Sequence, residues 1–397
     1  MRCLHLAVLA AAASLVPSAR AQGPGFQTPG MPTFGYAGIE SSQATRFSSE
    51  FNPAFSFVVD ALGDYVRYSG RSDDGFDADV RGFELGAMAW VDPKAWAYFI
   101  GAMEDEQLAI EEAALHYVGF EENSTLRAGR FFIDFGKQMQ VHVHELRTVE
   151  RPLVLRAYLG EEVKGDGIQW DDWRPVGDKT AVRWSIGAFS SILPEEDEFL
   201  PDPAKSVDER KDIQDFSFTA RVTGFTDLSD NAILQLGASA RVVPDYAVEF
   251  EATGDTEEGL DNTVWGLDAT YGWIDDTGQR RWTLGAECLV NTGDTGADNP
   301  APGTVDVLDD TVCGYYAFVD YAWSRYGSAG LQFSAVELPD LNASDLSETE
   351  LYYTHAFSEF QRLRLGLSAI DREDEDAFRV ALQYTAVLGA HGHGVNW

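Results

Sequence analysis

Two histidines stand two residues apart in the stretch QMQVHVHELRTVERP, which covers residues 138–152. In an extended segment His142 and His144 would point to the same side, because side chains alternate along a strand. Two imidazoles on one side suit zinc, but a closed zinc site needs three or four ligands. Glu145 and a more distant acid are both candidates for a third ligand, and nothing in the sequence selects between them. Whether the pair binds a metal, forms a catalytic centre or belongs to an ordinary polar loop depends on the segments around it.

The N-terminus has the features of a bacterial secretory signal peptide. Arg2 precedes an apolar run, and Ala19-Arg20-Ala21 forms a cleavage pattern of small residues. The apolar run is shorter than the ~18–20 residues that a spanning helix needs. We therefore expect residues 1–21 to be a signal peptide. Residues 22–54 are rich in Gly, Pro and Ser and are expected to form a flexible leader.

From Phe55 onward, apolar residues alternate with polar or small ones, which is the pattern of β-strands. In QRLRLGLSAI, for example, Leu363, Leu365 and Leu367 alternate with Arg364, Gly366 and Ser368. We predict about sixteen strands. They cover residues 55–66, 81–91, 95–104, 109–118, 124–132, 167–173, 180–190, 216–226, 231–243, 263–274, 279–291, 311–324, 327–337, 349–358, 361–371 and 376–389.

Short turns alternate with longer, acidic connections between these strands. The longer ones fall near residues 67–80, 133–166, 191–215, 244–262, 292–310 and 338–348. An even number of strands, joined by short turns at one end and longer connections at the other, is typical of transmembrane β-barrels. The strands of a soluble β-sandwich or propeller also alternate apolar and polar residues, but these folds do not need two classes of connection at opposite ends. We therefore predict an all-β fold, a transmembrane antiparallel β-barrel over residues 55–390. It would have short periplasmic turns, long acidic extracellular loops and a tail at 391–397.

The chain is strongly acidic, with a formal net charge of −36 over 397 residues, which argues against a nucleic-acid partner. Cys3 lies in the predicted signal peptide, so Cys288 and Cys313 remain. Both lie on segments that are predicted to form a hairpin. A cross-strand disulfide and two small apolar residues on one face are both compatible with these positions.

Several segments resemble porins of the phosphate-selective porin O/P superfamily of Gram-negative bacteria. The resemblance is carried by FNPAFSFVVDALGDY (51–65), LRAGRFFIDFGKQ (126–138), VHVHELRTVERPLVLRAYLGEEVKGDGIQW (141–170) and the C-terminal VALQYTAVLGAHGHGVNW. It implies a sixteen-stranded, usually trimeric barrel in the bacterial outer membrane that contacts lipid and lipopolysaccharide and passes small hydrophilic solutes. It gives no reason to expect phosphate specificity, because the 133–166 connection has only Lys137 and Lys164 in place of a lysine cluster.

The connection 133–166 is the predicted constriction, provided that it folds into the lumen like the analogous loop of porins. Fixed charges in a narrow pore select solutes by sign and position. The alternative is a loop that is packed by its own salt bridges. Candidate pore-lining residues in or beside the loop are Arg130, Asp134, Lys137, His142, His144, Glu145, Arg147, Glu150, Arg151 and Arg156. Those on inward strand faces are Arg127, Arg183, Arg221, Arg241 and Arg364, with acids such as Glu84, Asp268 and Glu287 on comparable positions.

The sequence therefore predicts a non-enzymatic outer-membrane porin for small hydrophilic solutes or ions. The second hypothesis is a substrate- or metal-specific uptake channel centred on residues 133–166. An outer-membrane hydrolase has the least support, since no P-loop, GxSxG motif or recognisable Ser/His arrangement occurs. No cofactor is expected other than a divalent metal at His142 and His144.

Overall fold

The computed structural model describes residues 53–69, 74–104, 107–120, 123–194, 205–207, 216–250, 253–338, 345–358, 360–372 and 376–389. The expected signal peptide, the expected leader up to residue 52 and the expected tail 391–397 lie outside these residues.

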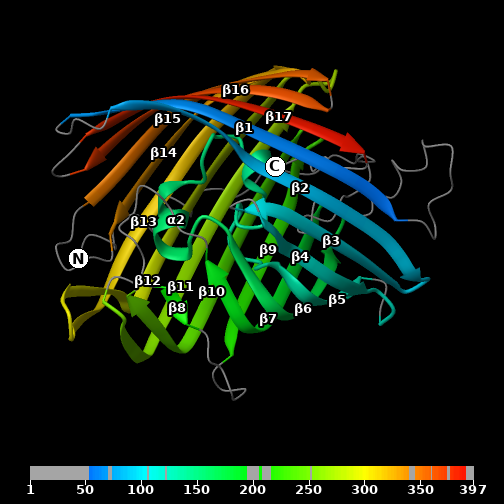
Figure 1. The fold of residues 1–397 in the computed structure, drawn as a ribbon. Helices are drawn as coiled ribbons and strands as arrows, with labels where there is room; N and C mark the ends of the chain where they lie inside the picture. Colours follow the sequence, from blue (N-terminus) through cyan, green and yellow to red (C-terminus); the bar gives the residue numbers. More distant parts are fainter. Residues whose placement is uncertain are drawn as a thin grey trace.

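Sixteen long antiparallel strands of the described chain close into one barrel (Figure 1). Closure is made by β1, which pairs with β2 on one side and β17 on the other. A closed sheet satisfies its own backbone hydrogen bonds and has no open edge. The barrel strands are β1 (Ala54–Tyr68), β2 (Gly75–Asp92), β3 (Ala95–Glu104), β4 (Gln107–Tyr117), β5 (Ser124–Phe132), β6 (Val163–Val176), β7 (Thr180–Pro194), β9 (Ser217–Ser229), β10 (Ala232–Phe250), β11 (Asp255–Ile274), β12 (Arg281–Ala301), β13 (Thr304–Ser324), β14 (Gly327–Glu337), β15 (Asp345–Ser358), β16 (Gln361–Arg372) and β17 (Ala377–Gly389).

The predicted fold class is confirmed, and each predicted strand corresponds to one strand of the barrel. A further strand of three residues, β8 (Lys205–Val207), pairs with the far end of β10. The helical segments among the described residues are the 3-10 turn η2 (Val143–Glu145) and helix α2 (Leu153–Leu159). In the part of the chain that is described, helices are too short and too polar to cross a bilayer.

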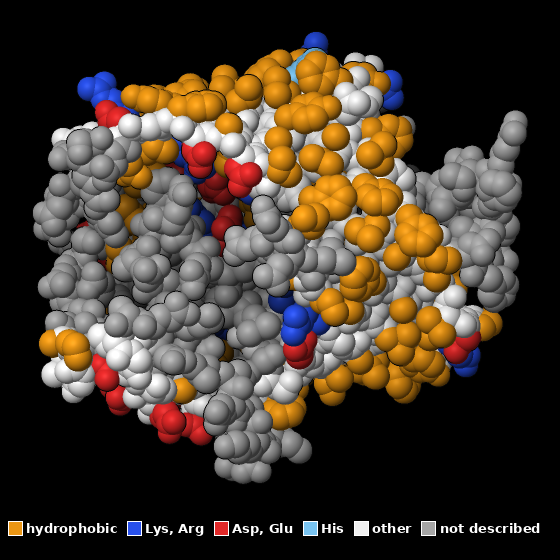
Figure 2. Space-filling view, viewed as in Figure 1, with side chains coloured by type: hydrophobic (Ala, Val, Ile, Leu, Met, Phe, Trp, Pro, Cys, Tyr) orange, Lys and Arg blue, Asp and Glu red, His pale blue; other side chains and the backbone are white. Residues whose placement is uncertain are grey.

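The barrel has an apolar outside and a polar inside. On β11, Trp265 and Leu267 are more than half exposed, whereas Asp268 and Thr270, which follow them along the strand, are buried. The same alternation occurs on β17, where Leu382 is exposed and Gln383 is buried. Figure 2 shows hydrophobic side chains over the visible outer wall, with charged side chains at the rim and inside the open mouth. The period of two along a strand produces this inversion, because successive side chains point to opposite faces.

Two of the predicted long loops are instead mostly strand. β10 and β11 extend through most of residues 244–262, and β12 and β13 extend through most of residues 292–310. The abundance of Gly, Asp and Asn in these segments favours loops, but cross-strand hydrogen bonding in a long hairpin outweighs this propensity. The acidic residues of these connections therefore lie largely on paired strands.

The strand register does not favour the cross-strand disulfide that the sequence left open beside the alternative of two small apolar residues. Cys288 lies opposite Tyr315, and Cys313 lies opposite Val290, so the two cysteines are diagonal neighbours. Diagonal positions on paired strands are ~7–8 Å apart, beyond the Cα separation of ~4.4–6.8 Å that a disulfide usually has. The hairpin turns between Ala301 and Thr304, and the irregularities between Asp294 and Gly296 and between Asp298 and Ala301 shift the register without bringing the two cysteines opposite each other.

Candidate functional site

The connection between β5 and β6, residues 133–162, turns into the barrel and is called the lumen segment below (Figure 1). Its apolar residues Phe135, Met139 and Leu153 are fully buried. They belong to one hydrophobic cluster with inward wall residues such as Val264 and Leu289. Removing apolar surface from water is favourable by roughly 25 cal/mol per Å2. This packing therefore holds the segment inside the barrel.

Asp134 fastens the start of the lumen segment to the wall. Its carboxylate lies 2.7 Å from the guanidinium of Arg183 on β7 and 3.8 Å from that of Arg221 on β9. Ser185 donates a hydrogen bond of 2.5 Å to the same carboxylate. Burial alone would raise the pKa of Asp134, but the two arginines outweigh it and hold the pKa below its ordinary value. Asp134 is therefore an ionised anchor.

The next turn touches the wall on β10 and β12. The backbone N–H of Gly136 donates to Ser239 Oγ at 3.0 Å, and Lys137 Nζ donates to Gln235 Oε1 at 2.8 Å. Gly136 has a φ of +55°, and a Cβ atom there would lie 1.9 Å from Glu287 Oε1. Only glycine fits both the left-handed backbone and this close approach.

The predicted wall arginines hold the segment instead of facing open water. Arg364 on β16 donates to the carbonyls of Leu146 and Thr148 and, at 2.6 Å, to Gln383 Oε1. Arg241 on β10 donates to the carbonyl of Tyr158 at 3.4 Å. Buried carbonyl and guanidinium groups lose their hydrogen bonds to water, and the hydrogen bonds between wall and segment replace them.

Acids on the segment and on the wall complete the ring of contacts. Glu150 bonds to Arg81 on β2 at 3.2 Å and to Arg379 on β17 at 2.9 Å. Burial would raise the pKa of Glu150, but Arg81 and Arg379 lower it below its ordinary value. Arg156 on α2 lies 2.8 Å from Glu348 on β15. The segment is thus tied to strands from nearly the whole circumference.

Two other predicted lining residues have different positions. Arg151 is fully buried within the segment and donates to the carbonyls of Gln138 and Val141. Arg127 is buried on the inner face of β5, with its guanidinium 3.9 Å from the ring centre of Phe131. Neither faces an open path.

The predicted lining role of Arg130 is wrong. It alternates with Arg127 on β5 and therefore points outward, where it pairs with Asp166 at 2.8 Å. The pair lies in a shallow hollow of the outer wall beside the exposed Ile110 and Ile168. Two residues three apart on a regular strand cannot share one face, which is the physical reason for the error.

Five charged residues of the lumen segment keep partial exposure. They are Lys137, Glu145, Arg147, Glu150 and Glu161. The guanidinium of Arg147 lies 4.9 Å from the ring centre of Phe318. Burial and, after it, the neighbouring charge of Arg147 together lower the pKa of Lys137 to about 7. These five residues are the charged side chains of the segment that remain partly accessible to water.

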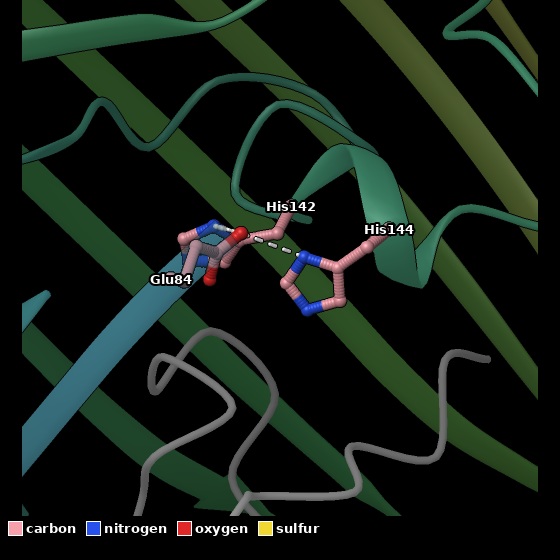
Figure 3. Close-up of side chains that lie close together, drawn as sticks. All are labelled: Glu84, His142 and His144. Atoms are coloured by element: carbon pink, nitrogen blue, oxygen red, sulfur yellow. Dashed lines mark ion pairs between the residues drawn. The ribbon is translucent and has the colours of Figure 1, made fainter. Parts of the chain in front are cut away.

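The two histidines lie against β2 and β4 with buried side chains (Figure 3). His144 Nδ1 is 2.8 Å from Glu84 Oε1, and His142 Nδ1 is 3.9 Å from the same oxygen. His142 Nδ1 is also 3.2 Å from Glu111 Oε1, and its Nε2 is 3.2 Å from Glu112 Oε1. The structure therefore supplies Glu84 as the third member that the sequence could not name.

The carboxylates set the charge of these imidazoles. Burial lowers the pKa of His142, but Glu111 and Glu84 raise it well above its ordinary value. For His144, burial is likewise outweighed by Glu84, which raises the pKa. Glu162 completes the group: it accepts a hydrogen bond from the Val143 N–H at 3.1 Å. Against the effect of burial, Lys164 and His142 hold the pKa of Glu162 at about 2.

A β-bulge brings two consecutive glutamates to the histidines. Ile100 on β3 pairs with Glu112, and Gly101 pairs with Ile110, so Glu111 is an extra residue on β4. Both glutamates are buried. Strict alternation would point one of them outward among apolar side chains. An acidic pair inside an otherwise apolar strand was the available signal for the bulge.

Comparison with known proteins gives a fold and no family assignment. No protein-family model matches the chain, and no curated protein matches it. Solved structures do match. An anion-selective porin of Comamonas acidovorans is 13% identical with a TM-score of 0.55, over 85% of this chain and 99% of that one. OprB of Pseudomonas putida is 11% identical with a TM-score of 0.55, over 84% and 94%. The outer membrane channel DcaP of Acinetobacter baumannii is 12% identical with a TM-score of 0.53, over 85% and 97%. The chain shares the sixteen-stranded barrel of porins.

Asp134→Asn is expected to loosen the lumen segment. The change removes one of the two carboxylates beside each of Arg183 and Arg221, since Asp171 and Asp268 remain, at a cost of about 1–3 kcal/mol. The segment would then open about 5- to 150-fold more often. Limited trypsin digestion of the folded protein measures this as faster cleavage after Lys137, Arg147 or Arg156. Asp178→Asn, in an exposed turn, is the matched control, and equal cleavage of the two variants would contradict the anchoring role.

Ion selectivity is expected to change with pH around 7 because of Lys137. Below about pH 7 its ammonium is charged and disfavours cations, and above that pH it is neutral, so preference for cations rises with pH. Charged groups that act on it are Arg147, Arg221, Asp268 and Glu287. Reversal potentials in a salt gradient measure the step, and Lys137→Met should reduce it. Lys94→Met, in an exposed turn, should leave it intact; an unchanged step in Lys137→Met would reject this assignment.

Proposed function

We propose that the chain is an outer-membrane porin through which small hydrophilic solutes or ions diffuse, narrowed by the lumen segment. The observation that carries this is a closed barrel with an apolar outside, a polar inside and residues 133–162 tied across its interior. The matched structures support it, since one of them is an anion-selective porin and another is an outer membrane channel. Within this proposal the five partly exposed charges of the segment line the constriction.

The finer affiliation rests on the sequence resemblance to the phosphate-selective porin O/P superfamily. By that resemblance we propose that three copies associate and that the outer face contacts lipid and lipopolysaccharide. Mixed charges at the constriction, with Lys137 and Arg147 on one hand and Glu145, Glu150 and Glu161 on the other, favour a channel that orients polar solutes. The proposal includes no catalytic activity.

Single-channel recordings in planar bilayers test the pore. The folded protein should conduct. Neutralising an acidic residue of the lumen segment and neutralising a basic one should shift the reversal potential in opposite directions. Glu145→Gln should reduce cation preference and Arg147→Gln should increase it, because fixed charges favour the opposite ion. Asp276→Asn, in an exposed turn, should leave it within error. Folded protein without conductance would refute the porin proposal, and shifts of the same sign in both variants would refute the lining.

A lysine on the outer face should destabilise the barrel according to its depth in the bilayer. Leu267 is 63% exposed and lies well inside β11, whereas Leu228 is 51% exposed and lies next to the end of β9. Leu267→Lys should cost about 2–4 kcal/mol and Leu228→Lys about 0–1 kcal/mol. Urea titrations in lipid vesicles measure both free energies of unfolding. Equal costs at the two positions would contradict a lipid-facing outer wall.

A further inference from the structure

Six ionisable side chains meet where the lumen segment crosses β2 and β4. They are Glu84, Glu111, Glu112, His142, His144 and Glu162. In two subsets every member offers one ligand atom and all these atoms lie within 4.8 Å of one another: Glu84 with His142 and His144, and Glu111 with His142 and Glu162. The subsets share His142, so one ion between them could take ligands from both.

We propose that this cluster binds one divalent transition-metal ion of the zinc type, with Glu84, His142 and His144 as ligands and Glu111 as a fourth. Metal binding is a property separate from solute diffusion, and it can be measured on protein that does not conduct. Zinc in proteins takes imidazole nitrogen and carboxylate oxygen at ~2.0–2.2 Å in a tetrahedral arrangement. The ligand atoms of such a site are therefore ~3.3 Å apart.

The distances in the cluster surround this value. Glu84 Oε1 lies 2.8 Å from His144 Nδ1 and 3.9 Å from His142 Nδ1, and His142 Nδ1 lies 3.2 Å from Glu111 Oε1. Figure 3 shows both imidazoles directed at the Glu84 carboxylate, with His142 just before the η2 turn and His144 within it. His142 Nδ1 lies within 4 Å of both carboxylate oxygens, so it is the atom around which the four ligands would gather.

The charge of the cluster fits a divalent cation. Glu84, Glu111, Glu112 and Glu162 bring four carboxylates, and the nearby cations Lys164 and Arg151 offset two of them. With neutral imidazoles as ligands, two negative charges remain in a buried space. An uncompensated buried charge is costly, so a doubly charged cation is a matching partner.

Glu111 supplies a second, independent observation. Its side chain is 4% exposed, and its Oε2 atom is buried without a hydrogen-bond partner in the structure. Buried carboxylate oxygens are normally satisfied, and an exception calls for an explanation such as an ion. Glu111 is also the residue that the β-bulge turns inward, toward His142.

The ligand types determine which metal fits. Imidazole nitrogens suit zinc and its transition-metal neighbours, whereas calcium and magnesium prefer sites built only of oxygen. The bound ion would join β2 and β4 of the wall to His142 and His144 of the lumen segment. It would therefore clamp the middle of the segment, between the Asp134 anchor and the Glu150 anchor.

Calorimetric titration of folded, untagged protein with zinc chloride tests the site, together with metal analysis after dialysis. We expect one zinc per chain, retained in the presence of millimolar calcium or magnesium. Glu84→Gln and His144→Ala should each weaken binding by about 100-fold or more, since even outer-shell partners of a metal contribute 10- to 100-fold. His355→Ala is the matched control, because His355 lies on β15 against Phe357, away from the cluster.

Cobalt provides a readout of ligand type that does not depend on affinity alone. The Co2+ form should show the visible absorption of a four-coordinate nitrogen and oxygen site, and Glu84→Gln should alter it. Glu84→Gln keeps the size of the side chain, so loss of binding with retained folding reports the ligand itself. Folding is checked by heat-modifiable migration in gels.

Absence of stoichiometric zinc in the wild type would overturn the proposal. Undiminished binding in Glu84→Gln and His144→Ala would also overturn it, by placing the ion elsewhere. A protein that conducts but binds no zinc contradicts only this inference. A protein that binds zinc at these residues but does not conduct contradicts only the proposed function.

Discussion

The inner wall of this barrel carries buried charges that need partners, and one segment supplies most of them. Arg183, Arg364 and Arg379 all reach the lumen segment, through a carboxylate or through backbone carbonyls. A buried guanidinium without a partner is costly, and so is a buried carbonyl. Wall and segment therefore stabilise each other, and neither arrangement is favourable alone. The apolar contacts of Phe135 and Leu153 stabilise the lumen segment against the wall but do not fix its orientation. The polar contacts fix the position of the segment in the barrel.

This division separates two roles that a list of charged residues confuses. Asp134 and Arg364 are buried and hold the segment, so their charge is screened from the channel by their partners. Lys137, Glu145 and Arg147 keep contact with the open space. In the proposed porin, the anchors determine where the lumen segment narrows the barrel, and the exposed charges determine which ions the channel favours. A change at an anchor is expected to act on pore size, and a change at an exposed charge on selectivity.

The strands were predictable because their signal is local: a period of two needs no knowledge of neighbours. Register and bulges were not predictable, because they depend on which residues pair across strands. The bulge at Glu111 brought an acid to His142, and the position of the hairpin turn, between Ala301 and Thr304, left Cys313 diagonal to Cys288. Alternation alone did foretell the inward direction of Glu84. Its contact with His144 required the three-dimensional path of the lumen segment.

The two arginines on Glu150 have a consequence for assembly. Arg81 lies on β2 and Arg379 on β17, and these strands flank β1 on opposite sides. One carboxylate thus bridges, from within, the seam where the first and last parts of the chain meet. Contacts between such distant residues form late, because ordering a long intervening chain is unfavourable. Glu150 of the lumen segment can contact Arg81 and Arg379 together only after β1 has paired with both β2 and β17. Docking of the segment therefore follows closure of the barrel and stabilises the closed form.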